Sequence, residues 1–118
     1  MGQPVAYFEI TSTSPVKIRD FYSALFGWSI EPDPTMEGYA MVDTGAGPEA
    51  VGGGIGPSQA PGDTGVKIYV RVDDLESRLA RAGELGADTL APPMELPGGY
   101  GRIAVVADPD GNPVGLWA

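Results

Sequence analysis

Apolar and polar residues alternate along two stretches of the chain, 5–11 and 66–72. Strict alternation is typical of a strand with one buried face, because successive side chains point to opposite sides of a sheet. The sequence therefore predicts two strands, each with an apolar and a polar face. The residues on the polar faces are Tyr7 and Glu9 in the first stretch and Lys67, Tyr69 and Arg71 in the second.

A helix is predicted after the first alternating stretch. Ser14 and Pro15 are typical of a helix N-cap and first turn, and Gly27 is a typical stop. Helical spacing in between predicts an apolar stripe, interrupted by Asp20. The stripe consists of Val16, Phe21, Leu25 and Phe26.

A second helix is predicted after the second alternating stretch. Asp73 or Asp74 is expected to cap it, and Gly86 is expected to end it just after Leu85. Its predicted buried stripe consists of Leu75, Leu79, Ala82 and Leu85.

Short apolar runs between turn-forming residues predict three further strands in each half: 28–31, 39–43 and 51–55, then 87–90, 102–107 and 114–117. Both halves thus have the order βαβββ, offset by about 60 residues, which indicates an internal duplication. We predict one α+β domain: module one at about 4–55, a connection at about 56–65, and module two at about 66–118.

The polar strand faces predict a binding cleft. One helix in each half can cover only the apolar face of its sheet, so the opposite faces are expected to curl around a concave space. Aromatic rings with polar tips and a few charges suit a planar small molecule. The residues predicted to line the cleft are Tyr7, Glu9, Tyr39, Met41, Lys67, Tyr69, Arg102 and Trp117, with Glu9 and Lys67 as a possible ion pair.

The composition of the chain excludes several classes of binding partner and of catalytic residue. The net charge of −9 opposes binding to nucleic acid and to anionic lipid surfaces. No apolar run approaches the roughly 20 residues of a membrane span, and with no cysteine we expect a cytoplasmic protein. The chain also has no histidine, which removes the usual general base and the commonest transition-metal ligand.

Four segments together resemble the vicinal-oxygen-chelate superfamily, also called glyoxalase/bleomycin-resistance/dioxygenase proteins. They are Tyr7-Phe8-Glu9-Ile10, the run Phe21-Tyr22-Ser23-Ala24-Leu25-Phe26-Gly27-Trp28, Val72-Asp73-Asp74-Leu75 and Asp108-Pro109-Asp110-Gly111-Asn112. The resemblance covers nearly the whole chain. It implies paired βαβββ modules curled around a cavity, and commonly a second subunit, so a homodimer is expected.

The resemblance also implies where a metal would be held. Enzymes of the superfamily bind one divalent metal with His and Glu side chains at equivalent strand positions. Those positions here are Tyr7, Lys67, Gly54 and Gly115. Glycine has no side-chain donor, the phenol is protonated near neutral pH, and an ammonium repels a cation. We therefore expect no metal and no other cofactor.

These observations favour a metal-free small-molecule binding protein with a sequestering, resistance-like or sensing role. Two alternatives stay open. One is a glyoxalase-like lyase or isomerase acting next to a carbonyl, through Glu9 and Lys67 or an all-carboxylate metal site. The other is an interaction protein whose cavity is filled by its own aromatic side chains. The absence of histidine and of the metal ligands favours a binding protein over an enzyme. The sequence does not identify the ligand.

Overall fold

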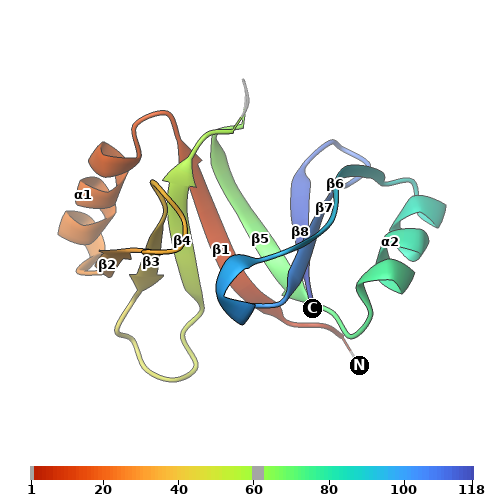
Figure 1. The fold of residues 1–118 in the computed structure, drawn as a ribbon, viewed down its shortest axis with the longest axis horizontal. Helices are drawn as coiled ribbons and strands as arrows, with labels where there is room; N and C mark the ends of the chain where they lie inside the picture. Colours follow the sequence, from red (N-terminus) through yellow and green to blue (C-terminus); the bar gives the residue numbers. More distant parts are fainter. Residues whose placement is uncertain (1, 60–62) are drawn as a thin grey trace. The chain divides into compact units, whose positions relative to one another are not determined.

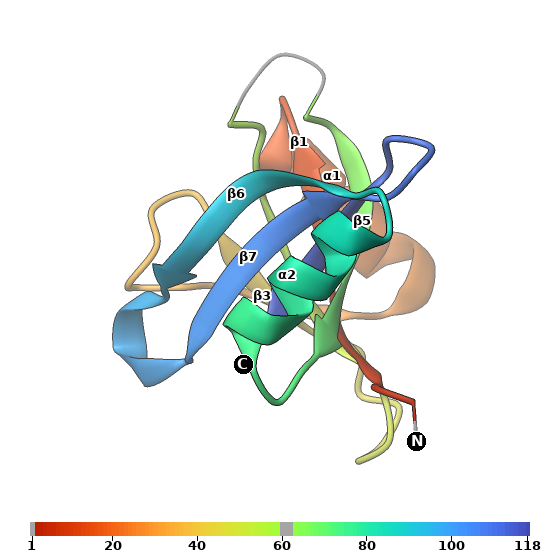
Figure 2. The same ribbon diagram turned by 90° about the vertical axis from the view of Figure 1, so that its right-hand side faces the viewer.

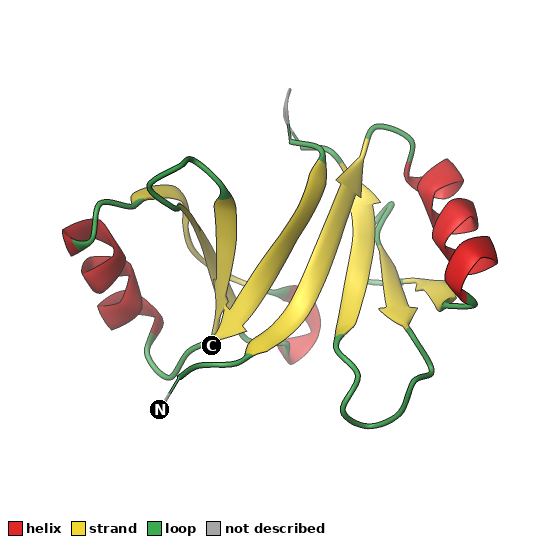
Figure 3. Cartoon of the chain, turned by 180° about the vertical axis from the view of Figure 1, so that it is seen from behind, coloured by secondary structure: helices red, strands yellow, loops and turns green. Residues whose placement is uncertain are grey.

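The computed structural model describes residues 2–59 and 63–118 and confirms the α+β class. Both halves have the predicted βαβββ order, shown as a ribbon in Figure 1 and by element type in Figure 3. The first half contains β1 (Val5–Ser12), α1 (Pro15–Phe26), β2 (Ser29–Pro32), β3 (Ala40–Asp43) and β4 (Gly52–Pro57). The second contains β5 (Gly65–Arg71), α2 (Leu75–Glu84), β6 (Asp88–Glu95), the short 3-10 helix η1 (Pro97–Gly99), β7 (Arg102–Ala107) and β8 (Pro113–Trp117).

The chain divides into two compact units, each with one α-helix. The α1 unit is Tyr7–Val66, and the α2 unit is Lys67–Ala118 together with the start of the chain up to Ala6. Of the predicted connection, residues 60–62 lie outside the described part of the chain, and the strands on either side of it extend to Pro57 and from Gly65. Within residues 2–59 and 63–118, neither helix has the length and hydrophobicity needed to cross a membrane.

In the α1 unit, four strands follow the order β2-β3-β4-β1. β1 pairs with β4 in parallel, whereas β3 is antiparallel to both of its neighbours. Helix α1 lies along one face of this sheet (Figure 1). The buried centre between helix and sheet consists of Ile10, Val42 and Ile55, with Phe8, Ile18, Tyr22, Trp28 and Ile30 packed against it.

The predicted apolar stripe of α1 is wrong. Phe21, Leu25 and Phe26 are 54%, 58% and 55% exposed, and Val16 is exposed as well. The helix instead turns Ile18 and Tyr22 toward the sheet. Its rotation follows the aromatic packing at its end, where the rings of Tyr22 and Trp28 stack with centroids 5.5 Å apart and planes 8° apart.

In the α2 unit, the order of strands is β5-β8-β7-β6, with β5 parallel to β8 and the other pairs antiparallel. Figure 2 shows α2 lying along β7. The core between them consists of Val72, Leu75, Ala104, Val106 and Leu116, and Leu79 and Ala82 pack against it as predicted. Leu85 is the exception: it is the C-cap residue of α2 and is 62% exposed.

The two predicted helix starts differ in their hydrogen bonds. Asp74 is the N-cap of α2, and its Oδ1 accepts a hydrogen bond from the Ser77 backbone N–H at 3.1 Å. Ser14 holds the N-cap position of α1, but its side chain makes no capping hydrogen bond. Its backbone N–H donates to Ser12 Oγ instead, at 2.9 Å.

Strand β6 is longer than its apolar pattern predicts. It continues past Leu90 through two prolines to Glu95, with irregular register against β7 on both sides of Ala91. Proline has no N–H to donate, but β6 stands at the end of the strand order, where an unpaired side is available. An edge strand therefore tolerates a sequence that reads as a loop.

Candidate functional site

In the α1 unit, the candidate site lies on the face of the sheet that does not pack against α1. Phe8 and Ile10 face the helix, so Tyr7 and Glu9 point to the opposite side of β1. The register places Glu9, Gly54 and Met41 side by side on three neighbouring strands. Three strands thus bring polar and apolar groups to one level of this face.

Glycine in β4 makes room for two tyrosine side chains on this face. A Cβ atom built on Gly54 would overlap the hydroxyl oxygens of both Tyr39 and Tyr7. A Cβ built on Gly56 would lie 2.6 Å from Cδ2 of the Tyr39 ring. Both glycines are buried. The phenol groups therefore rest directly on the backbone of β4, in the space that a side chain would fill.

The hydroxyl groups form a short hydrogen-bonded chain that ends on a carboxylate. Tyr39 Oη–H donates to Glu9 Oε2 at 3.0 Å, and the Oη atoms of Tyr7 and Tyr39 are 2.7 Å apart. A phenol has only one proton, so Tyr7 is the donor to Tyr39. Tyr7 Oη also lies 3.7 Å from Met41 Sδ. The four predicted site residues of the α1 unit are thus in one group.

Both phenols are kept neutral. Burial raises the pKa of Tyr7 to about 12, and the nearby Glu9 carboxylate adds to the rise. The pKa of Tyr39 is also raised, first by burial and then by the charge of Glu9. Neutral phenols present apolar faces and are poor bases and nucleophiles near neutral pH. The group is therefore suited to holding a molecule in place.

In the α2 unit, a tyrosine packs on a glycine in the same way. Tyr69 and Gly115 are paired in the register of β5 and β8, and a Cβ built on Gly115 would overlap the Tyr69 ring. Only 5% of Tyr69 is exposed. Its neighbours Val70 and Leu116 belong to the core under α2, so Tyr69 points to the face away from that helix.

Arg102 is the predicted site residue that lies apart from this face. It alternates with the core residues Ala104 and Val106 along β7 and so points to the α2 side. There its guanidinium donates to both carboxylate oxygens of Glu76, at 2.8 and 2.7 Å. Hydrogen bonding to Arg102 lowers the pKa of the Glu76 carboxyl. Arg102 is thus already bound to a residue of α2.

The other predicted cleft residues of the α2 unit lie on its helix-free face. Lys67 is half-buried and stands two residues before Tyr69 on β5. Trp117 is opposite Arg71, and its Nε1–H donates to the Tyr100 carbonyl oxygen at 2.7 Å. Glu9 belongs to the other unit, so the ion pair between Glu9 and Lys67 stays a prediction.

The side chains at the implied metal positions do not fit a divalent cation. Gly54 and Gly115 offer no donor, and tyrosine side chains occupy the space above both. Tyr7 is a neutral phenol there, and Lys67 is a cation. Among residues 2–59 and 63–118, no three His, Cys, Asp or Glu side chains are grouped closely enough to hold a metal ion.

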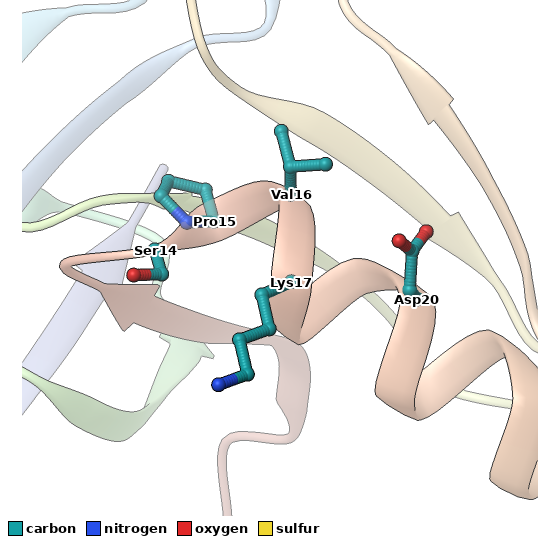
Figure 4. A pocket seen from close by; sticks show the side chains of 5 residues that line it. All are labelled: Ser14, Pro15, Val16, Lys17 and Asp20. Carbon is teal, nitrogen blue, oxygen red and sulfur yellow. The ribbon is translucent and has the colours of Figure 1, made fainter.

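A surface pocket lies elsewhere, at the start of α1 (Figure 4). It is wide open to solvent, and its lining contains none of the predicted site residues. The residues around it are Ser14, Pro15, Val16, Lys17 and Asp20.

Comparison with known proteins identifies the class as the glyoxalase-like α+β fold. The sequence profile described as "Glyoxalase-like domain" matches residues 8–117, and the chain belongs to this family. The predicted superfamily is therefore confirmed.

Two solved structures show the same fold. A glyoxalase/bleomycin resistance protein/dioxygenase superfamily member from Vibrio splendidus has a TM-score of 0.66 at 15% identity, covering 98% of this chain and 97% of that one. Methylmalonyl-CoA epimerase from Mycobacterium tuberculosis has a TM-score of 0.68 at 14% identity, covering 96% and 85%. At these identities the likeness shows the fold alone.

Sequence relatives are longer than this chain. The anthracycline biosynthesis protein DauV of Streptomyces sp. (strain C5) is 29% identical over 133 residues, which cover 98% of this chain and 46% of DauV. CFP32 of Mycobacterium bovis is 26% identical over 115 residues, covering 94% of this chain and 44% of CFP32. The chain thus spans about half the length of the curated relatives that it matches.

The contact between tyrosine and glycine predicts opposite effects of two alanine substitutions. Gly54→Ala should destabilise the protein by about 1–3 kcal/mol, because the new methyl group displaces two hydroxyls. Gly83→Ala in α2, where nothing lies within 4 Å of the added Cβ, should stabilise it by about 0.5–1 kcal/mol. Urea unfolding of both variants measures the difference. Equal effects of the two substitutions would contradict the packing.

The raised pKa of Tyr7 predicts a late step in alkaline titration. The neutral phenol contributes stability that is fully present below its unfolded pKa of about 10. That contribution is lost as the pH rises toward the folded pKa of about 12. Phenolate absorbance should include a step near pH 12 that Tyr7→Phe removes. If Tyr7→Phe removes a step near pH 10 instead, Tyr7 is not buried as described.

Proposed function

We propose that this chain is a metal-free small-molecule binding protein of the glyoxalase-like fold. The observation that carries the proposal is the hydrogen-bonded group of Tyr7, Tyr39 and Glu9, with Met41 beside it. Rigid phenol rings beside a carboxylate and a thioether provide flat apolar surface and a few fixed polar atoms, which is the usual composition of a small-molecule site. Neutral phenols favour binding over proton transfer.

A planar aromatic ligand fits this surface best. Tyrosine rings stack on flat molecules, and their position on the β4 backbone fixes them before binding, which reduces the entropy lost on association. The name of DauV links one relative to anthracycline biosynthesis, and this supports testing polycyclic aromatic compounds first.

A second candidate is an interaction protein whose cavity is filled by its own side chains. The observation in its favour is the same packing of Tyr39 on Gly54 and of Tyr69 on Gly115, since those rings occupy the space above the glycines. The two candidates differ in what is left for a ligand. A binding protein responds to small molecules, whereas a self-filled one does not.

Thermal unfolding with a panel of planar aromatic compounds, including an anthracycline, distinguishes the candidates. At least one compound should raise the melting midpoint, because a ligand at 100 times its Kd stabilises the native state by about 2.7 kcal/mol. Glu9→Gln should weaken that compound about tenfold, since a hydrogen bond to a charged group is lost. Glu49→Gln, an exposed loop carboxylate of the same unit, is the matched control.

Two results would overturn the proposal. An unchanged midpoint across the whole panel would favour the self-filled interaction protein. Divalent metal that stays bound at one ion per chain after dialysis, and that Glu9→Gln removes, would contradict the metal-free site and favour the enzyme.

We further propose that the chain associates as a homodimer through the exposed face of α1. Phe21, Leu25 and Phe26 are each more than half exposed, and adjacent exposed apolar side chains are typical of protein interaction sites. The double length of the relatives is consistent with a second domain of this size in their chains. Sedimentation should give a mass of two chains, and Phe21→Ser with Leu25→Ser should halve it. A mass of one chain for the unmodified protein at micromolar concentration would contradict the dimer.

A further inference from the structure

Arg71 and Trp117 form a cross-strand pair on the helix-free face of the α2 unit. They are register partners in β5 and β8, and the guanidinium carbon of Arg71 lies over the indole ring, 4.5 Å from its centroid. Arg71 is exposed, whereas Trp117 is half-buried. An arginine at this distance is held by a cation–π interaction, which does not use the N–H groups of the guanidinium as hydrogen-bond donors to an acceptor atom.

The indole below Arg71 is fixed in position. Trp117 Nε1–H donates to the Tyr100 carbonyl oxygen at 2.7 Å, which ties the ring to the segment between η1 and β7. Gly101 follows directly, and a Cβ built there would lie 3.2 Å from Trp117 Nε1 and 2.5 Å from the Ala118 carbonyl oxygen. The backbone therefore approaches the indole closely, and the Arg71 guanidinium lies over a ring whose position is fixed by these contacts.

Arg71 differs from Arg81 and Arg102 in having no carboxylate partner. Arg102 binds Glu76 and Arg81 binds Glu84. For Arg71, the described part of the chain supplies no ion pair, although the protein has 16 acidic residues against 7 basic ones. In so acidic a protein, an exposed guanidinium that is held by an aromatic ring but not neutralised is a ready anion-binding group.

We propose that Arg71 and Trp117 bind the carboxylate group of a planar small molecule. The proposal rests on the small-molecule function proposed above and adds a second binding group, in the α2 unit, with its own class of ligand. The N–H groups of one guanidinium match the two oxygens of one carboxylate. A singly charged group also suits a protein of net charge −9, which repels a doubly charged phosphate more strongly.

The surroundings of Arg71 support an aromatic body for this ligand. Tyr100, whose backbone carbonyl oxygen accepts the Trp117 indole N–H, is 53% exposed. The alternation along β5 predicts Arg71 on the polar face of its strand, but the contact with Trp117 depends on the pairing of β5 with β8 and has no signal in the sequence.

The test uses benzoate as the probe, with benzyl alcohol as its uncharged counterpart and inorganic phosphate as a second anion. All three are titrated at constant ionic strength into the 15N-labelled full chain, and the indole N–H signal of Trp117 is followed by NMR. Benzoate should shift this signal saturably, and benzyl alcohol and phosphate should bind at least about tenfold more weakly, a difference of about 1.4 kcal/mol.

Three variants assign the effect to Arg71. Arg71→Gln should weaken benzoate binding about tenfold or more, and Arg71→Lys should give an intermediate affinity because it keeps the charge but loses the paired N–H groups. Arg81→Gln, an exposed arginine of α2, is the matched control and should bind like the unmodified protein.

Several results would overturn the assignment: no saturable shift with benzoate, equal binding of benzyl alcohol, tighter binding of phosphate, or unchanged binding by Arg71→Gln. These failures are separable from those of the proposed function. If an aromatic compound raises the melting midpoint but binds Arg71→Gln as tightly as the unmodified protein, the carboxylate site is wrong and the small-molecule function stands.

Discussion

Direct contact between tyrosine side chains and glycine backbone is the constraint on which the candidate site depends. A side chain at Gly54 would overlap the hydroxyls of Tyr39 and Tyr7, and a side chain at Gly115 would overlap the ring of Tyr69. The two glycines lie in the fourth strand of each βαβββ module. Both modules thus have a glycine in the fourth strand, and in both an aromatic side chain packs directly on the backbone of that glycine.

Because of this packing, the chain has the fold of its family but not the side chains that the family's enzymes use to bind a metal. The fold resemblance implies side-chain ligands for a metal at positions 54 and 115, and here these positions carry no side chain at all. The remaining positions have a phenol with a raised pKa and an ammonium group, neither of which suits a divalent cation. Family membership therefore establishes the architecture, and the residues on the helix-free faces decide what it can do.

Much of the architecture could be predicted because it follows from local patterns of apolar and polar residues in the sequence. Alternation in β1 and β5, the helix signals after each and the short apolar runs that follow predict two βαβββ modules. The grouping of Tyr7 with Glu9 follows from the same alternation. Met41 joins them because β3 pairs with β4 at the level of Gly54.

The errors arise where tertiary packing outweighs the local pattern. All four residues of the apolar stripe predicted for α1 are exposed, because Ile18 and Tyr22 pack against the sheet in their place. Arg102 shares a strand face with Ala104 and so meets Glu76 rather than Tyr69. The packing of tyrosine on glycine could not be predicted from the sequence pattern, because the two residues of each contact are far apart in the sequence.

The packing of tyrosine on glycine is tested most directly by the NMR signals of the Hα protons of Gly54 and Gly115. Aromatic protons that touch a backbone Hα give strong NOE cross-peaks, and the ring current shifts that Hα from its usual position. The packing of tyrosine on glycine predicts NOEs from Gly54 Hα to the Tyr39 ring and from Gly115 Hα to the Tyr69 ring, with both Hα signals displaced. Ordinary glycine shifts without these cross-peaks would contradict it.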